Sequence, residues 1–181
     1  MPPSPTIKVF KTEELDSNTR SAIIELCVAA HREEDFRNLF SYVPSGGLHF
    51  LACQSERLVS HALVTPRWLQ PEGLPELRTA YVDAVATLPT QQGQGYGSAV
   101  MRQLASTVDG EYVIACLETE REELYKRLGW ETWRGALAGR SEHGLIPTPE
   151  QTGIMILRLS QTPPLDLDSA LTIEHQVGRI W

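Results

Sequence analysis

Residues 79–108 read TAYVDAVATLPTQQGQGYGSAVMRQLASTV, and this stretch decides the expected fold. Its first part, residues 79–87, is apolar and rich in β-branched residues, as is typical of a strand. A turn with three glycines follows, and apolar residues then recur at helical spacing, at Val100, Met101, Leu104, Ala105 and Val108. The stretch therefore predicts a strand, a glycine turn and an amphipathic helix, in that order.

The segments before this stretch predict a helix and a hairpin. Residues 15–31 begin with capping residues and place Ile23, Cys27 and Ala30 on one helical face. Residues 48–53 and 58–65 have the composition of strands, and the short turn between them predicts an antiparallel hairpin. A loop is expected before the next strand, because it would contain Pro66, Pro71, Gly73 and Pro75.

The segments after the stretch predict a second half of α/β character. Residues 112–117 form a short apolar run that suits a buried strand, which completes a βαβ unit. Thr119 and Glu122 have the spacing of a capping box, and this predicts a helix over residues 120–128 that ends at Gly129. Further strands are expected at 130–138 and 154–159, separated by a loop over 139–153, whereas the tail 163–181 shows no clear pattern. The fold class is therefore α/β (α+β), a mixed sheet with flanking helices in a single domain over 1–181.

The composition narrows the possible partners. The net charge of −7 argues against nucleic acid and favours cationic partners. Residues 1–6 have neither the basic nor the apolar part of a signal peptide, and apolar runs are too short for a membrane span, so we expect a cytoplasmic protein without membrane contact. Cys27, Cys53 and Cys116 are widely spaced, which argues against disulfides and a metal site.

The glycine turn is a candidate phosphate site. Glycines at 93, 95 and 97, ahead of a helix, would expose consecutive main-chain N–H groups at its positive end. The alternative is that these glycines only permit a tight turn. No Gly-Lys-Ser/Thr follows, and the preceding strands are antiparallel, so neither a Walker motif nor a dinucleotide fingerprint is favoured. Coenzyme A remains as the expected ligand.

Two motifs resemble the GNAT acetyltransferases. Gln92-Gly-Gln-Gly-Tyr-Gly97 matches their acetyl-CoA motif, Arg/Gln-x-x-Gly-x-Gly/Ala, and Tyr125-Lys-Arg-Leu-Gly-Trp130 is similar to their late signature. The resemblance implies a GNAT fold, with a mixed, mostly antiparallel, twisted central sheet and a splayed fourth strand. It also implies that acetyl-CoA binds without metal. The pyrophosphate would lie on the main chain of Gln92, Gly93, Gln94, Gly95, Tyr96 and Gly97, and the pantetheine along Val85, Ala86 and Thr87.

Acetyl transfer to an amine requires a base, an oxyanion donor and a proton for the leaving thiolate. Asp83 is placed to accept the amine proton, directly or through water, and its alternative role is that of a strand-end carboxylate in a structural hydrogen bond. Tyr125 is the candidate acid by resemblance, and its alternative role is core packing. The resemblance also assigns the oxyanion to the N–H of Val85.

The chain further resembles the aminoglycoside 2′-N-acetyltransferases over most of its length. The resemblance rests on residues 35–36, 46–49, 81–86, 124–135 and 147–150 and on Trp181. It implies acetylation of the 2′-amine of an aminoglycoside, antibiotic resistance and a homodimer. The substrate contacts that follow from it are Asp35, Asp83, Ala84, Glu118 and the terminal carboxylate of Trp181.

Departures from that family's pattern point to a less cationic substrate. Phe40, the pair Gln151-Thr152 and Arg179 stand where the family usually has acids. An arginine can pair with a ligand carboxylate, so Arg179 favours an acid-bearing aminoglycoside such as kasugamycin over kanamycin or gentamicin. Two alternatives stay open: acetylation of another small-molecule or peptide amine, and a non-catalytic acyl-CoA-binding module. The five histidines, at 31, 49, 61, 143 and 175, are interpreted as structural.

Overall fold

The computed structural model describes residues 5–181, so residues 1–4 of the N-terminal stretch used to argue against a signal peptide lie outside the described residues. Contacts divide the chain into two compact units. Unit 1 runs to Thr65 and includes Val82–Thr107, whereas unit 2 comprises Pro66–Tyr81 and Val108–Trp181. The long strands β3 (Arg57–Pro71) and β4 (Leu77–Thr87) contribute residues to both units.

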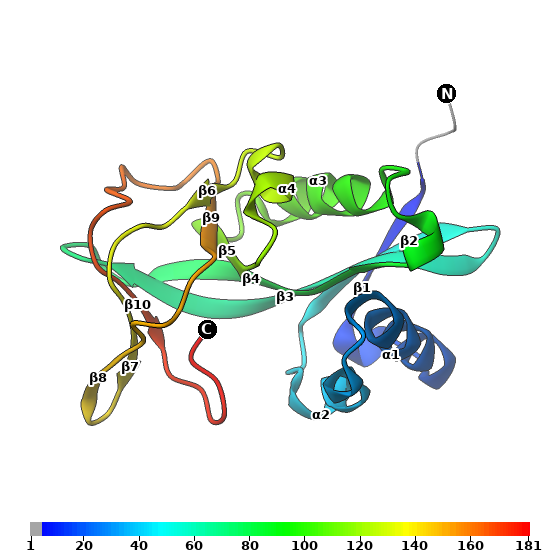
Figure 1. The fold of residues 1–181 in the computed structure, drawn as a ribbon, viewed down its shortest axis with the longest axis horizontal. Helices are drawn as coiled ribbons and strands as arrows, with labels where there is room; N and C mark the ends of the chain where they lie inside the picture. The colour runs from blue at the N-terminus through cyan, green and yellow to red at the C-terminus, as the bar shows by residue number, and fades with distance from the viewer. Residues whose placement is uncertain (1–4) are drawn as a thin grey trace. The chain divides into compact units, whose positions relative to one another are not determined.

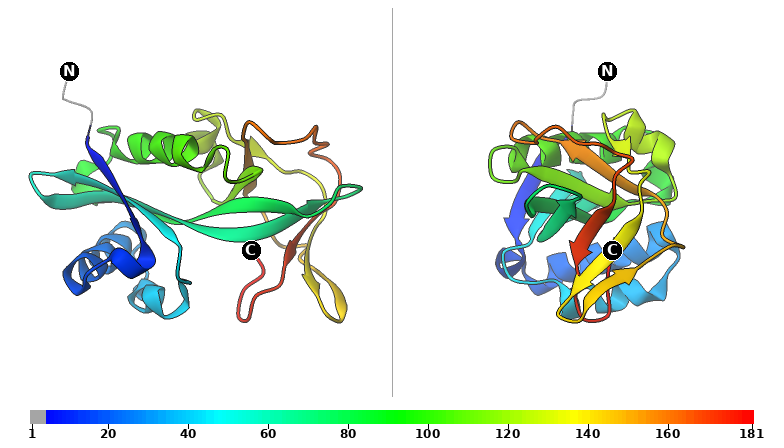
Figure 2. Two further views of the ribbon diagram at one scale, coloured as in Figure 1. Left: turned by 180° about the vertical axis from the view of Figure 1, so that it is seen from behind. Right: turned by 90° about the vertical axis from the view of Figure 1, so that its left-hand side faces the viewer.

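Unit 1 is a sheet with helices on both faces. Strands β1 (Ile7–Lys11) and β2 (Leu48–Gln54) are antiparallel, and so are β2 and β3. The N–H of Leu88, directly after β4, bonds to the Val59 carbonyl of β3 at 2.9 Å. The helices are α1 (Ser17–His31), α2 (Leu39–Tyr42) and α3 (Tyr96–Val108). Helices α1 and α2 cover one face of this sheet and α3 the other (Figures 1 and 2).

Helix α1 begins and ends as its sequence predicts. Asp16 caps its N-terminus by accepting the N–H of Thr19 at 2.7 Å. Ile23 and Cys27 are fully buried, and Leu26 joins them in an apolar cluster with residues of β2 and β3, whereas Ala30 is only partly buried. The predicted stripe of α3 is buried as well, with Ala105 as its one partly exposed member.

Hydrogen bonds join the strands of unit 2 in the order β6-β9-β5-β4-β3-β10-β7-β8. Strands β10 and β7 are parallel, whereas the pairs β5–β9, β6–β9, β7–β8 and β10–β3 are antiparallel, so the sheet is mixed as expected. The bounds of these elements are β5 Ile114–Glu118, α4 Glu122–Lys126, β6 Glu131–Thr132, β7 Leu137–Ser141, β8 Gly144–Pro147, β9 Ile154–Arg158 and β10 Leu171–Glu174.

The proline-rich loop predicted after residue 65 is wrong. Strand β3 continues through Pro66 to Pro71, and β4 already begins at Leu77. Alternation continues past the proline, because Pro66 and Trp68 are exposed whereas Arg67 and Leu69 are buried. Strand β10 pairs with this extension.

The single strand predicted over 130–138 is also wrong. It is divided into β6 and β7, with Gly135 between them. A Cβ at Gly135 would lie 1.7 Å from the carbonyl oxygen of Ser169, so the backbone here packs against another segment. The loop expected over 139–153 contains the β7–β8 hairpin, and the tail contributes β10.

The capping box predicted at the start of α4 does not form. The Thr119 hydroxyl accepts the N–H of Arg121, and the Glu122 carboxylate accepts the hydroxyl of Thr132 at 2.6 Å. Thr119 and Glu122 therefore bond to Arg121 and Thr132 instead of forming the box, and the helix begins at Glu122 instead of residue 120. Gly129 has a left-handed backbone, with φ of 88°, after the helix end, as predicted.

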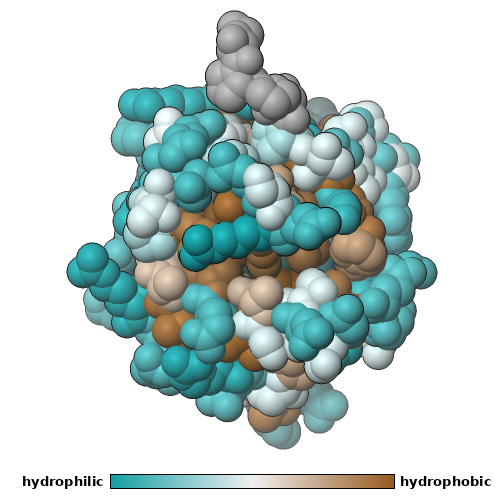
Figure 3. Space-filling view, turned by 90° about the vertical axis from the view of Figure 1, so that its right-hand side faces the viewer, coloured by the Kyte–Doolittle hydropathy of each residue, from teal (hydrophilic) through white to brown (hydrophobic). Residues whose placement is uncertain are grey.

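Some apolar surface of unit 1 stays exposed. Figure 3 views the side on which α1, β1 and β2 lie in Figure 1, and brown apolar surface lies there between teal polar residues. Val9 and Tyr42 are exposed large apolar residues of this unit. Within residues 5–181, none of the helices has both the length and the apolar character needed to cross a bilayer.

Candidate active site

The glycine turn precedes α3 in unit 1, as the sequence predicts. Gly93 and Gly95 have φ of 76° and 87°, a region that favours glycine, and a Cβ at either position would meet only open space. The N–H of Ala99 bonds to the Gly95 carbonyl at 2.9 Å, so the N–H groups of residues 96–98 lie ahead of the first helical bond. The first turn of α3 holds no acidic side chain. This geometry suits the binding of phosphate oxygens.

The turn is held close to the end of β4. A Cβ at Gly97 would lie 3.1 Å from the Thr87 hydroxyl, which makes this position tight for any larger residue. The side-chain amide of Gln92 donates to the Thr87 carbonyl at 3.2 Å, and that of Gln94 donates to the Thr90 carbonyl at 3.4 Å. Both glutamine side chains therefore brace the loop.

Strand β4 is irregular where the splay was expected. Ala84 has φ of 49°, a left-handed conformation that is uncommon for a residue with a side chain. The main-chain carbonyls of residues 84–86 accept hydrogen bonds from side chains of neighbouring elements. Ala84 accepts from His61 Nδ1 at 2.9 Å, Val85 from His31 Nε2 at 3.0 Å, and Ala86 from Ser60 Oγ at 3.0 Å.

The carboxylates Asp83 and Asp35 belong to the same unit. Asp83 directly precedes the left-handed Ala84 and is partly buried. Asp35 is exposed in a short 3-10 segment, Glu34–Asn38, between α1 and α2. An anionic side chain beside an irregular strand offers a proton acceptor or a cation-binding group.

In unit 2, Tyr125 lies on α4 and is nearly buried, with 7% exposed. Its ring meets that of Trp130 edge-on, with centroids 6.1 Å apart. Burial raises the pKa of the Tyr125 hydroxyl to about 12, so the group is protonated at neutral pH and is a weaker acid than an exposed tyrosine. Tyr125 thus packs in the core and also carries a protonated hydroxyl.

Glu118, at the end of β5, is held by a residue of the loop before β9. Gln151 Nε2 donates to Glu118 Oε1 at 2.7 Å and also to the Thr152 carbonyl at 2.9 Å. That loop is packed tightly, because a Cβ at Gly153 would lie 1.9 Å from the Thr119 carbonyl oxygen. A neutral amide thus occupies one oxygen of the exposed carboxylate.

The C-terminal segment brings Arg179 and Trp181 next to Tyr81. The Arg179 guanidinium lies 4.9 Å from the centre of the Tyr81 ring, and its Nε donates to the main-chain oxygen of Trp181 at 2.7 Å. The Trp181 indole is 6% exposed and donates to the Thr148 hydroxyl at 2.9 Å. The indole therefore belongs to the core of unit 2. The main-chain oxygen of Trp181 already pairs with the guanidinium of Arg179.

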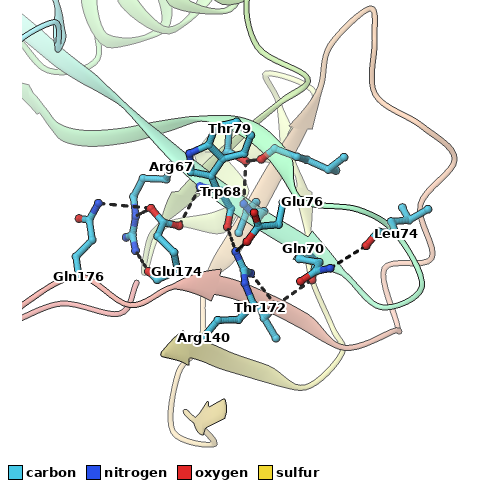
Figure 4. Close-up of polar contacts among 12 residues, drawn as sticks. Arg67, Trp68, Gln70, Leu74, Glu76, Thr79, Arg140, Thr172, Glu174 and Gln176 are labelled. Carbon is cyan, nitrogen blue, oxygen red and sulfur yellow. Dashed lines mark hydrogen bonds and ion pairs between the residues drawn. The ribbon is translucent and has the colours of Figure 1, made fainter. Parts of the chain in front are cut away.

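A buried arginine anchors this segment. Arg67 is 1% exposed, and Figure 4 shows it directed at Glu174 from β3. Its Nε donates to a Glu174 carboxylate oxygen at 3.0 Å, and its Nη2 donates to the main-chain oxygens of Glu174 and Ile180 at 2.6 and 2.7 Å. Removing a buried partner of this kind is costly, so the network fixes the backbone that carries Arg179.

The predicted site residues fall into two sets. Unit 1 carries the cofactor segment, with Asp35, Asp83 and Ala84, and unit 2 carries Tyr125, Glu118, Arg179 and Trp181. The sequence patterns did not predict that His49 and His61 form a buried pair, in which His49 Nδ1 and His61 Nε2 lie 3.0 Å apart. The signal was present in the hairpin, because an antiparallel register places the two as diagonal neighbours. Among residues 5–181, no group of three metal-ligating side chains is found.

Comparison with known proteins agrees with this geometry. Residues 8–133 match the model of the acetyltransferase (GNAT) domain. An aminoglycoside 2′-N-acetyltransferase of Mycolicibacterium fortuitum is 29% identical over 97% of this chain and 92% of its own length.

Solved structures share the fold. A GNAT family N-acetyltransferase from Escherichia coli in complex with CoA matches 99% of this chain and 96% of its own, with 13% identity and a TM-score of 0.65. Eis1 from Mycobacterium abscessus matches 74% of this chain with 18% identity and a TM-score of 0.59, and the match spans about a third (32%) of that longer chain. The strand, glycine turn and helix order, together with the match over residues 8–133, lead to one conclusion: the chain belongs to the GNAT acetyltransferase family.

Proposed function

We propose that the protein transfers an acetyl group from acetyl-CoA to the 2′-amine of an aminoglycoside, with kasugamycin as its substrate, and that residues 1–181 act as one domain. The observation that carries the proposal is the pair of left-handed glycines, Gly93 and Gly95, ahead of α3, which follow the left-handed Ala84 of β4 in the same unit. The relative from Mycolicibacterium fortuitum supports the choice of an aminoglycoside.

The residues of unit 1 suit the coenzyme. Acetyl-CoA supplies an activated acetyl thioester when bound. In this proposal, the main-chain N–H groups of residues 92–97 receive its pyrophosphate, and the main chain of residues 85–87 runs along its pantetheine. The open space around Gly93 and Gly95 and the absence of acidic side chains from the first turn of α3 support this assignment.

The chain's own groups would then move the protons. Asp83 accepts the proton of the attacking amine, directly or through water. The N–H of Val85 donates to the acetyl oxygen as negative charge develops there. Tyr125, which is protonated at neutral pH, donates its hydroxyl proton to the departing thiolate.

The choice of kasugamycin rests on the residues that replace acids. Phe40 is uncharged and offers no carboxylate to a cationic sugar, and its ring centre lies 5.0 Å from the Arg20 guanidinium. Gln151 occupies an oxygen of Glu118, and Arg179 supplies a cation in the C-terminal segment. In the proposal, Asp35, Asp83, Ala84 and Glu118 contact the sugar, whereas Arg179, beside Trp181, pairs with the carboxylate of the drug. The −7 net charge would attract the cationic remainder of the drug.

The proposal is tested by binding and turnover together. Calorimetric titration of the full chain with CoA and acetyl-CoA should give micromolar binding, and kasugamycin should release thiol from acetyl-CoA faster than kanamycin or gentamicin. Mass analysis of the product should show one added acetyl group on the 2′-amine, and expression in a sensitive bacterium should confer kasugamycin resistance. Turnover of kanamycin in preference to kasugamycin would refute the substrate, and CoA binding without thiol release from any amine would favour a binding module.

Two further parts of the proposal concern the protein in the cell. We propose a cytoplasmic homodimer, because acetyl-CoA is a metabolite of that compartment and the exposed Val9 and Tyr42 offer apolar surface for association. Sedimentation at micromolar concentration should give twice the mass of the 20.2 kDa chain. A monomer would refute this part and leave the catalytic proposal intact.

A further inference from the structure

A column of hydrogen-bonded side chains crosses the interior of unit 1. The Thr12 hydroxyl lies 3.1 Å from His49 Nε2, and His49 Nδ1 lies 3.0 Å from His61 Nε2. His61 Nδ1 in turn lies 2.9 Å from the carbonyl oxygen of Ala84. Both histidines are fully buried, so these contacts are shielded from water.

The contact between His61 and the Ala84 carbonyl determines which ring nitrogens of the column carry a proton. A carbonyl oxygen only accepts, so His61 Nδ1 must carry a proton and donate it. In a neutral ring the other nitrogen then accepts, which makes His49 Nδ1 a donor to His61 Nε2. By the same rule His49 Nε2 accepts. The hydroxyl proton of Thr12, whose oxygen lies 3.1 Å from His49 Nε2 and 3.2 Å from the Gly47 carbonyl oxygen, is shared between these two acceptors. The ring protons of both histidines therefore point towards Ala84.

Burial keeps the two rings neutral. It lowers the pKa of His61 to about 4 and, together with the neighbouring ring, lowers the pKa of His49 to about 3. The neighbours are compatible with this state, because the charged side chain that acts on His49 is the cation Arg20, and the uncharged Phe40 ring stacks on His49 with centroids 5.6 Å apart. No protonation event is needed for the column to act.

The column ends on the one strained residue of β4. Ala84 is left-handed, and a conformation of this kind persists only when surrounding groups hold it. The peptide that carries the Ala84 carbonyl also carries the N–H of Val85. Fixing the direction of the carbonyl therefore fixes the opposite direction of that N–H.

We infer that the column Thr12–His49–His61 is a positioning device that holds the Ala84 carbonyl and thereby aims the Val85 N–H at the acetyl oxygen. His49 and His61 touch neither substrate nor coenzyme in this role, and they act through the peptide between Ala84 and Val85. The inference rests on the proposed function, which gives the Val85 N–H its task. It extends that function to buried residues far from Asp83 and Tyr125 in the sequence.

Three variants separate positioning from folding. His61→Leu removes the donor to Ala84, whereas His61→Asn retains an amide donor near the position of Nδ1. The double variant His49→Leu/His61→Leu removes the column without leaving a ring nitrogen unpaired, so it keeps the fold testable if the single variant is unstable. His143→Leu, an exposed histidine of unit 2, is the matched control.

Nuclear magnetic resonance of ¹⁵N-labelled histidine reads the column without any turnover. The expected result is that His49 and His61 are both protonated on Nδ1 at neutral pH, and that the Val85 amide resonance moves in His61→Leu and returns towards its original position in His61→Asn. A His61 ring protonated on Nε2 alone would overturn the inference.

The rate of thiol release from acetyl-CoA measures how the variants affect catalysis. A misdirected oxyanion donor should lower kcat by about 10- to 100-fold in the leucine variants, with KM for the amine changed by less than about threefold, and asparagine should restore most of the rate. Folded leucine variants with the wild-type kcat would overturn the inference while leaving the proposed function in place. A wild-type protein that binds CoA and releases no thiol would instead overturn the proposed function and, with it, the catalytic role of the column.

Discussion

Gln151 and Glu118 are joined by a hydrogen bond of 2.7 Å, from the amide Nε2 to the carboxylate Oε1, at the end of β5. A neutral side chain is thus paired with the carboxylate that we propose as a contact of the cationic sugar. Gln151→Glu should create a pair of carboxylates and lower KM for kanamycin by about fivefold, because an added charge is worth roughly 1 kcal/mol in a solvated site. Gln151→Ala, which adds no charge, is the control. Equal effects of the two variants in steady-state kinetics would contradict this explanation.

Arg179 should decide whether an acid-bearing drug is preferred. Arg179→Gln keeps a polar side chain but removes the cation, and we expect KM for kasugamycin to rise by about tenfold with kcat little changed, because ground-state pairing is lost. Arg134→Gln removes a guanidinium that pairs with the exposed Asp168 and serves as the control. An unchanged KM in the Arg179 variant would show that the drug's carboxylate binds elsewhere.

Tyr125→Phe should affect the chemical step more than the fold. The variant keeps the ring that packs against Trp130 and loses only the hydroxyl, so we expect kcat to fall by about 10- to 100-fold at an unchanged thermal midpoint. The pH profile of the wild type should show no titration of Tyr125 below pH 9, since burial raises its pKa to about 12. Tyr112→Phe, at another buried tyrosine, is the comparison. Equal losses in both variants would indicate a packing effect.

Gly95→Ala should weaken coenzyme binding. The left-handed φ of 87° costs any side chain about 1–2 kcal/mol, and relaxation of the loop would turn its N–H groups away from the phosphates. Gly73→Ala introduces comparable strain, at φ of 76°, in the turn between β3 and β4. Calorimetry should show weaker CoA binding in the Gly95 variant alone. The loss of binding in both would attribute the effect to general destabilisation.

Stability should fall as the pH drops from about 6.5 to 4. The pKa values of His49 and His61 are lowered to about 3 and about 4 by burial, so in this window the unfolded chain binds protons that the native state does not. Above the unfolded pKa of about 6.5 neither state binds them, and the full stability is present. Each histidine should remove up to about 1.4 kcal/mol per pH unit from the free energy of unfolding.

Urea unfolding at pH 7 and pH 5 measures this loss, which should be on the order of 2–4 kcal/mol in the wild type. The double variant His49→Leu/His61→Leu should lose much less between the same two pH values. Carboxylates with lowered pKa, such as Asp16 and Asp168, titrate below this interval, because their ordinary value is already 3.8. The same pH dependence in both proteins would show that other groups cause it.

Local patterns predicted the elements well where each segment's own chemistry decides its structure. Helix α1 has its cap at Asp16 and its buried face at Ile23 and Cys27, and the glycine turn precedes α3, all as expected. Periodicity failed where distant segments intervene. The extension of β3 past Pro66 depends on pairing with β10, and the break at Gly135 depends on the backbone of Ser169.

The sequence by itself determined the family and the order of strand, glycine turn and helix, and it supplied the groups that we propose to bind phosphate and move protons. Hydrophobic period and turn chemistry are local properties, and they can be read along the chain. Only the tertiary structure decided which partners those groups meet. His49 and His61 come together through strand register, the Ala84 carbonyl accepts a hydrogen bond from a ring of β3, and Gln151 reaches Glu118 from another loop. The energies of such contacts depend on burial and on residues distant in sequence, which no local pattern specifies.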